Sequence, residues 1–284
     1  MVSRTIGAKQ GNSMGCGGMK FAVNLTVMFK EYPLLERFQA AANAGFKGVE
    51  LLTLDGVHAE ELAAAARKAG VEVVLFNNNM GDFLNNGLGL SGVPGRQREF
   101  RESIDESQLI AAALNVPNMH IGPSLIPKGI ERDRCMEVYK ENLMYAADKM
   151  EKVGAKVLLE PMNYQDMPAA LLTDTEEALE IIEALGSNNL GLQFDFYHMY
   201  MNGVDLPSCL SDVIERVDHI QFSDSPGRNE PGSGEIDFLS GLKIVQQSNY
   251  GGWISAEYKP TKRTEDTLGW KALFENLNEE ETQS

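Results

Sequence analysis

Cysteine, histidine and positive charge are scarce in this sequence. Only three cysteines occur among its 284 residues, and Cys16, Cys135 and Cys209 have no spacing typical of a metal site or a disulfide framework. We therefore expect a reducing, cytoplasmic setting. The sequence has 25 Lys and Arg residues but 41 Asp and Glu residues, and the resulting net charge of -16 disfavours nucleic acid as a partner. Since no apolar run approaches the roughly 20 residues of a membrane span, we expect no membrane association.

The composition is that of a globular domain, with 43% hydrophobic and 23% charged residues, enough for a sizeable core. The first 19 residues have neither an apolar segment nor a periodic pattern. We interpret them as a disordered N-terminal extension, or as a start assigned too early, and leave open whether they belong to the mature protein. We expect residues 20–277 to form one domain and residues 278–284 to form an acidic tail.

Short apolar runs alternate with longer helical patterns from Lys20 onward. Eight strand–helix units with no linker between them predict a single α/β domain, and a closed (β/α)8 TIM barrel suits this regular repeat. An open doubly wound sheet is the competitor, but no Gly-rich phosphate loop follows the first strand. The predicted strands are Phe21–Leu25, Phe46–Leu52, Val71–Phe76, Asn118–Ile121, Lys156–Glu160, Leu190–Asp195, His219–Phe222 and Gly252–Glu257.

Three predicted strands end in carboxylates. Glu160, Asp195 and Glu257 directly follow apolar runs, and Gln221 lies near the end of another strand. The carboxyl ends of barrel strands meet at one face, where barrel enzymes have their active sites. Each residue taken alone could be a helix cap or a satisfied strand end. Together they repel one another unless a cation or shared protons are present, and their hard oxygen atoms suit Mg²⁺ or Mn²⁺.

Glu160 and Glu257 are also candidates for proton transfer. We expect the two side chains to face one another across the barrel mouth, with a substrate carbon held between them. One carboxyl could remove a proton next to a carbonyl group and the other could return it, provided that burial tunes their pKa values.

The histidines could have functional or structural roles. His198, three residues after Asp195, could hydrogen-bond a substrate hydroxyl, or it could be a capping or packing residue. His120 could contact the substrate. His219 shares a strand face with Gln221 but lies deeper in the barrel, so we expect a structural role. His58 is a plain helix-start residue.

The segment Val217–Asp237 begins as a strand and continues into a loop that carries several charges among its Pro and Gly residues. Charges held at the end of a buried strand are typical of a site for a small polar substrate, although a solvated surface turn is the simpler alternative. Arg228 in this loop and Lys259 after the last strand are candidates for binding a substrate carboxylate.

Several motifs closely resemble the hydroxypyruvate isomerase family, one of the xylose isomerase-like TIM barrels. They are EPMN at Glu160, QFDFYHM through His198, HIQFSDSPGRNEPGSGEI from His219 and AEYKP at Glu257, with VNLTVMFKEYP and GVPGRQREFR nearer the start. The resemblance covers about residues 20–270. It implies that Glu160 and Glu257 are the catalytic proton donor and acceptor, and that Asp195 and Gln221 complete a divalent-metal site with them.

Two departures from the related ketose 3-epimerases favour the isomerase branch. Gln221 stands where those enzymes have a histidine ligand, and the loop from it to Arg228 is one residue longer. The segments NNNMGDF at Asn77 and NMHIGPS at Asn118 differ from the typical isomerase versions and line the same mouth, so the substrate stays open.

Our leading hypothesis is an aldose–ketose isomerase of a short 2-oxo acid, converting hydroxypyruvate to 2-hydroxy-3-oxopropanoate. The alternatives are a 2-oxo-tetronate isomerase and a ketose 3-epimerase with the same glutamates. A catalytically silent sugar-acid sensor would gain nothing from clustered carboxylates. A metal-dependent endonuclease would need more histidines than the four present. A homo-oligomer paired through outer helices is possible, but the sequence indicates no pairing face.

Overall fold

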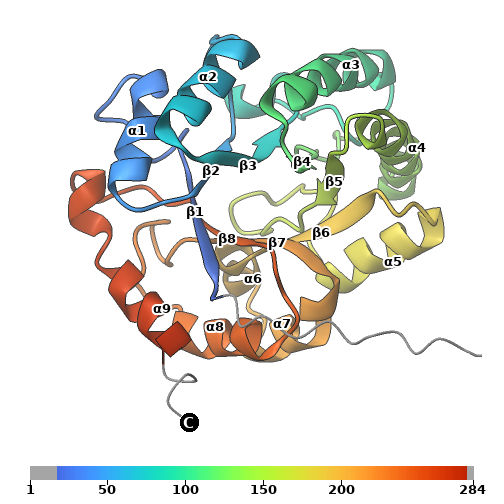
Figure 1. Cartoon of the computed structure of the whole chain (residues 1–284). Coiled ribbons are helices and arrows are strands. Elements are labelled where there is room, and N and C mark those ends of the chain that lie inside the picture. The colour runs from blue at the N-terminus through green and yellow to red at the C-terminus, as the bar shows by residue number, and fades with distance from the viewer. Residues whose placement is uncertain (1–17, 280–284) are drawn as a thin grey trace, which may run out of the picture.

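Eight parallel strands form a closed barrel in the computed structural model of the protein, which describes residues 18–279 (Figure 1). The strands pair in chain order, and pairing of the first with the eighth closes the ring. This confirms the predicted (β/α)8 barrel over the open sheet. The strands are β1 (Lys20–Asn24), β2 (Gly48–Leu51), β3 (Glu72–Asn77), β4 (Asn118–His120), β5 (Lys156–Leu159), β6 (Leu190–Asp195), β7 (Val217–Phe222) and β8 (Trp253–Ala256).

Helices surround the ring of strands (Figure 1). Each of the eight predicted strand–helix units is present, and the boundaries differ from the predicted ones by a few residues. The helices are α1 (Leu34–Asn43), α2 (Ala59–Ala69), α3 (Gln97–Leu114), α4 (Arg132–Glu151), α5 (Thr175–Leu185), α6 (Phe196–Met201), α7 (Leu206–Val213), α8 (Phe238–Gln247) and α9 (Trp270–Glu279).

The short helix α6 was not expected from the sequence. It begins directly after the last residue of β6 and spans six residues, too few to show a helical period. It matters for function because it turns the chain immediately at the carboxyl end of a barrel strand.

The terminal predictions lie mostly outside the described residues. Residues 1–17 of the predicted extension and 280–284 of the predicted tail are not described, while α9 continues two residues past the predicted end of the domain. No helix between residues 18 and 279 is both long and apolar enough to cross a membrane. Within the same range, Cys135 and Cys209 form no disulfide.

Strand β7 shows how the barrel separates an apolar shell from a polar interior. Phe222 packs against Trp270 of α9 and Phe238 of α8, with ring centroids 5.0 and 5.9 Å apart. Because side chains alternate along a strand, His219 and Gln221 point the other way, into the barrel. Both are buried. The inside of a TIM barrel is usually filled by branched apolar residues, so a buried polar interior indicates that this end of the barrel serves a function.

Candidate active site

Three polar side chains gather at the carboxyl ends of β5 and β6. Glu160 directly follows β5, Asp195 ends β6, and His198 lies in α6. All three are buried, and one candidate ligand atom from each lies within 4.8 Å of the others. Glu160 Oε1 and Asp195 Oδ2 are buried oxygens without a hydrogen-bond partner. Two neighbouring carboxylates with bare lone pairs require a cation or a proton nearby.

The two oxygens of Asp195 have different surroundings. Oδ1 accepts a hydrogen bond from the backbone N–H of Tyr197 at 2.7 Å and so caps α6. Oδ2 faces the site, 3.6 Å from Nη2 of Arg228 and 3.8 Å from Nε2 of His198. Asp195 is therefore both a helix cap and a site carboxylate, which the sequence presents as alternatives.

The hydrogen bonds of His198 define its protonation. Its Nδ1 accepts from the backbone N–H of Asn163 at 3.2 Å and lies 2.8 Å from the side-chain amide of the same residue. Because a backbone N–H can only donate, Nδ1 is unprotonated and the proton of the neutral ring is on Nε2. Burial lowers the pKa of His198 well below its usual value, and the charge of Arg228 lowers it further. His198 is thus suited to donate a hydrogen bond to a substrate oxygen and not to ligate a metal.

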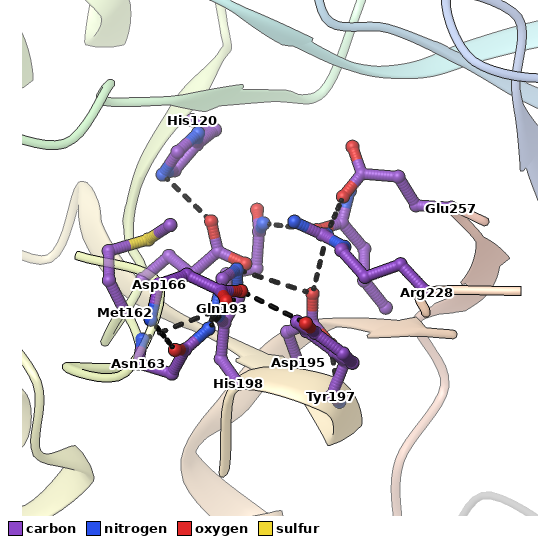
Figure 2. Close-up of polar contacts among 12 residues, drawn as sticks. His120, Met162, Asn163, Asp166, Gln193, Asp195, Tyr197, His198, Arg228 and Glu257 are labelled. Carbon is purple, nitrogen blue, oxygen red and sulfur yellow. Dashed lines mark hydrogen bonds and ion pairs between the residues drawn. The ribbon is translucent and has the colours of Figure 1, made fainter. Parts of the chain in front are cut away.

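Arg228 connects the carboxylates of strands six and eight (Figure 2). Its Nη2 donates to Oε2 of Glu257 at 2.9 Å and forms the 3.6 Å ion pair with Asp195. The guanidinium carbon lies 4.8 Å from the ring centroid of Tyr197, whose hydroxyl donates to Asp166 at 2.9 Å. A guanidinium group has five N–H donors. Arg228 can therefore hold Glu257 and still offer donors to an anionic substrate.

The loop after β7 is built to hold Arg228 in place. The buried carboxylate of Asp224 accepts hydrogen bonds from the backbone N–H groups of Ser225, Gly232, Gly234 and Ile236, at 2.8 to 3.1 Å. A side chain at Gly234 would bring its Cβ within 2.1 Å of a backbone oxygen. This loop is therefore ordered from within, and at these positions it is not the solvated surface turn that the sequence also allowed.

The other charges of the loop lie farther out. Glu230 contacts Thr261, and Glu235 is exposed and accepts from the hydroxyl of Tyr200. The backbone N–H of Lys259 donates to the carbonyl of Arg228 at 2.6 Å, but the Lys259 side chain is exposed. Of the two predicted carboxylate-binding residues, the structure brings the side chain of Arg228 to the carboxylates.

His120 lies beside Glu160. Its Nδ1 is 2.8 Å from the side-chain amide of Asn77, and its Nε2 is 3.3 Å from Oε2 of Glu160. Burial lowers the pKa of His120 to about 3, and the neighbouring His198 and His219 lower it further. The ring is consequently neutral near pH 7 and can act as a hydrogen-bond partner beside Glu160.

The carboxyl groups of the site hold their protons unusually tightly. Burial raises the pKa of Glu160 well above its usual value, and the charges of Asp195 and Glu257 raise it further. Burial also raises the pKa of Glu257 to about 8 against the opposing charge of Arg228, and it raises the pKa of Asp195. Carboxyl groups that titrate near neutral pH are effective general acids and bases.

A family model described as xylose isomerase-like TIM barrel matches residues 38–279. The chain belongs to the xylose isomerase-like TIM barrel family. Its relatives include the hydroxypyruvate isomerase of Escherichia coli, 35% identical over 89% of this chain and 98% of that protein. The 2-oxo-tetronate isomerase of Pectobacterium atrosepticum is 36% identical over 88% of this chain and 96% of its own length. The chain is thus an enzyme of an isomerase family.

Among solved structures, a protein of Brucella melitensis described as an AP endonuclease of family 2 has the same fold. It matches with a TM-score of 0.85 and 35% identity, over 90% of this chain and 98% of that one.

The xylose isomerase-like fold and its cluster of buried carboxylates could hold a divalent cation, and the residues present fit one. The bare oxygens of Glu160 and Asp195 are hard ligands of the kind that Mg²⁺ and Mn²⁺ prefer. Glu257 and Gln221 stay the predicted remaining ligands. His198 lies close to this group but presents a protonated nitrogen.

Gln221 has partners of its own in this structure. Its Nε2 donates to Glu50 at 2.8 Å, and its Oε1 accepts from Nε2 of Gln193 at 2.7 Å. An amide oxygen has two lone pairs, so one of them is available for a cation. The Oε1 of Gln193 is itself buried without a hydrogen-bond partner.

The predicted set of site residues omitted several side chains that the structure brings to the site. Asn24, Glu50, Asn163, Tyr197 and Gln193 are not among the predicted site residues. The signal that could have found Gln193 is its position two residues before Asp195, on the same strand face.

The raised pKa of Glu257 predicts that the stability of the metal-free protein depends on pH. Folding raises this pKa from 4.5 to about 8. The folded state therefore binds the proton more tightly, and this stabilisation is complete below about pH 4.5 and is lost as the pH rises through about 8. In EDTA we expect the melting temperature to fall between about pH 6 and 8.5 and to fall less in Glu257→Gln. Calorimetric scans giving equal slopes for both proteins would contradict this.

Proposed function

We propose that this protein is an aldose–ketose isomerase of a short 2-oxo acid. The reaction converts hydroxypyruvate to 2-hydroxy-3-oxopropanoate (tartronate semialdehyde) by glutamate-mediated proton transfer through an enediolate. The observation that carries the proposal is the pair of glutamates, buried Glu160 and half-buried Glu257, whose pKa values are raised by burial, that of Glu257 to about 8. The name of the Escherichia coli relative supports the substrate.

The proton transfer balances within the substrate. A glutamate carboxylate takes a proton from C3, and the electron pair of that C–H bond forms the C2–C3 double bond of the enediolate. The protonated glutamate then returns the proton to C2, while one hydroxyl proton moves from O3 to O2. The result is an aldehyde at C3 and a hydroxyl group at C2, with no external oxidant or reductant.

Other residues of the chain hold the substrate for this step. Arg228 offers its remaining N–H donors to the substrate carboxylate, and bidentate binding by a guanidinium group fixes the orientation of such an anion. The Nε2–H of His198 donates to a substrate oxygen next to the reacting carbons. Because its ring is neutral, it does not add a positive charge that would over-stabilise the anionic enediolate.

A divalent cation would be held by Glu160, Asp195, Gln221 and Glu257. When bound, such a cation supplies electrostatic stabilisation of negative charge on substrate oxygens. The two bare carboxylate oxygens of the site support this assignment.

Two related reactions are the alternatives. The Pectobacterium atrosepticum relative has nearly the same identity to this chain as the Escherichia coli one, which favours 2-oxo-tetronate isomerisation as the second candidate. A ketose 3-epimerase would use one glutamate on each face of a single carbon. It would not need Arg228 to bind a carboxylate.

A substrate panel tests this proposal. Proton NMR would follow hydroxypyruvate, a 2-oxo-tetronate and a neutral ketose with the enzyme in EDTA, and then after addition of Mg²⁺ or Mn²⁺. We expect the fastest turnover with hydroxypyruvate and an increase on adding metal. Preferred turnover of the tetronate or ketose would shift the assignment to that alternative. Thermal stabilisation by hydroxypyruvate without turnover of any compound would indicate a binding protein and contradict an isomerase.

A further inference from the structure

A fully buried carboxylate, Glu50 of β2, lies beneath the site and has no part in the proposed chemistry. It has three side-chain hydrogen-bond partners. Its Oε1 contacts Nε2 of His219, and its Oε2 accepts from Nε2 of Gln221 at 2.8 Å and from Nδ2 of Asn24 at 3.4 Å. A buried charge is costly to a fold unless it is fully hydrogen-bonded. The fold retains this one, and two of its partners lead directly to proposed site residues.

The first connection runs through two amides in series. Because the carboxylate of Glu50 can only accept, Gln221 must turn its N–H group toward it and its oxygen away. That oxygen then accepts from Nε2 of Gln193, which leaves the Oε1 of Gln193 buried without a partner. Each amide thus takes its orientation from the group before it.

The second connection runs through Asn24. Its Oδ1 accepts from the backbone N–H of Thr26 at 2.9 Å, which fixes the orientation of the amide. Its Nδ2 is therefore the donor, and it bridges Oε2 of Glu50 and Oε1 of Glu257, the latter at 3.0 Å. Glu257 is held in this way from below by Asn24 and from the loop side by Arg228.

We propose that Glu50, held by His219, is a positioning residue. It orients the amide of Gln221, a proposed metal ligand, and through it the amide of Gln193, and through Asn24 it fixes the carboxylate of Glu257. The expected effect on Mn²⁺ binding rests on the proposed function and its cation site. The orientation of the amides by hydrogen bonds depends on neither metal nor substrate.

The variant Glu50→Gln tests this arrangement while keeping the side-chain shape. With its oxygen kept on His219, its new N–H group would face the N–H groups of Gln221 and Asn24, and the amide of Gln221 would have to turn over. Groups that orient metal ligands typically contribute about 10- to 100-fold in affinity. We expect Mn²⁺ binding, measured by titration calorimetry on the metal-free protein, to weaken by this factor. We also expect kcat to fall with little change in KM.

A double variant separates positioning from simple structural support. Combining Glu50→Gln with Gln221→Glu exchanges donor and acceptor, so the new N–H group at position 50 donates to a carboxylate at position 221. We expect this exchange to recover most of the Mn²⁺ affinity and kcat. Asp218→Asn is the matched control, since Asp218 is also on β7 but pairs with Lys156 at 2.5 Å outside the site. We expect it to leave both quantities within about twofold of wild type.

The proposal is overturned if Glu50→Gln binds Mn²⁺ and turns over substrate as well as wild type does. It is also overturned if the double variant is as impaired as the single variant. A wild type that binds no Mn²⁺ would refute the proposed cation site instead. In that case, the side-chain amide NMR signals of Gln221 and Gln193 test the positioning role. Each signal is assigned by its loss in Gln221→Glu or Gln193→Glu. Glu50→Gln should shift the amide signals of both glutamines, and unchanged signals would refute the positioning role without metal or substrate.

Discussion

Glu160→Gln and Glu257→Gln should each lower kcat by about 10²- to 10⁴-fold, the usual contribution of a general acid or base. The amide keeps the size of the side chain but cannot accept or return a proton. The pKa values of both carboxyl groups are raised by burial, that of Glu257 to about 8, and raised pKa values favour proton transfer by carboxyl groups. Because both are also predicted metal ligands, Mn²⁺ affinity must be measured for each variant.

The control is Glu230→Gln, in the loop after β7, whose carboxylate contacts Thr261 away from the site. We expect its kcat to stay within about twofold of wild type. Exchange of the C3 hydrogens of hydroxypyruvate with solvent identifies which glutamate abstracts the proton, since that exchange stops only when the base is lost. Full activity of Glu257→Gln with Mn²⁺ bound would refute the proposed mechanism.

Arg228→Met should raise KM for 2-oxo acids by about 10- to 150-fold, because a hydrogen bond to a charged group contributes about 1.5–3 kcal/mol. The methionine retains an unbranched apolar stem beside Tyr197 but loses the charge and all N–H donors. The same change removes the cation that pairs with Glu257 and Asp195. We therefore also expect Mn²⁺ to bind more tightly, since two carboxylates would then lack their cationic partner.

Two further variants and a second substrate make this test specific. Lys259→Met should leave KM unchanged within about twofold, since that side chain is exposed and only its backbone contacts Arg228. Arg228→Lys should recover part of the affinity, because an ammonium group keeps the charge without the bidentate geometry. With a neutral ketose, Arg228→Met should have little effect on KM. An equal loss on acids and neutral sugars would show that Arg228 does not bind a carboxylate.

The barrel and its carboxylates could be predicted from the sequence for a simple reason. Parallel strands in a closed barrel all end at one face, so the residue that ends each apolar run is assigned to that face without knowledge of any contact. Glu160, Asp195 and Glu257 were found in this way. Arg228 was found because its loop carried more charge than a turn requires.

The pairings within the site could not be predicted in this way. His219 and Glu50 are 169 positions apart, and Asn163 and His198 are 35 apart, so no local pattern connects them. The amide orientation of Gln221 depends on Glu50, and the protonation of His198 depends on one backbone N–H. Lys259 and Arg228 were equivalent candidates in the sequence, and only the course of the backbone after β8 separates them.

The most direct test of proton transfer by the glutamates is the fate of hydrogen at C2 of the product. Hydroxypyruvate carrying deuterium at C3 would be converted by the enzyme in ordinary water, and the product would be analysed by NMR and mass spectrometry. Transfer through an enediolate predicts that solvent hydrogen appears at C2, because a glutamate proton exchanges with water during the reaction. Complete retention of the deuterium at C2 that persists at an unchanged rate in Glu160→Gln and Glu257→Gln would indicate a direct hydride shift and would contradict the role proposed for Glu160 and Glu257.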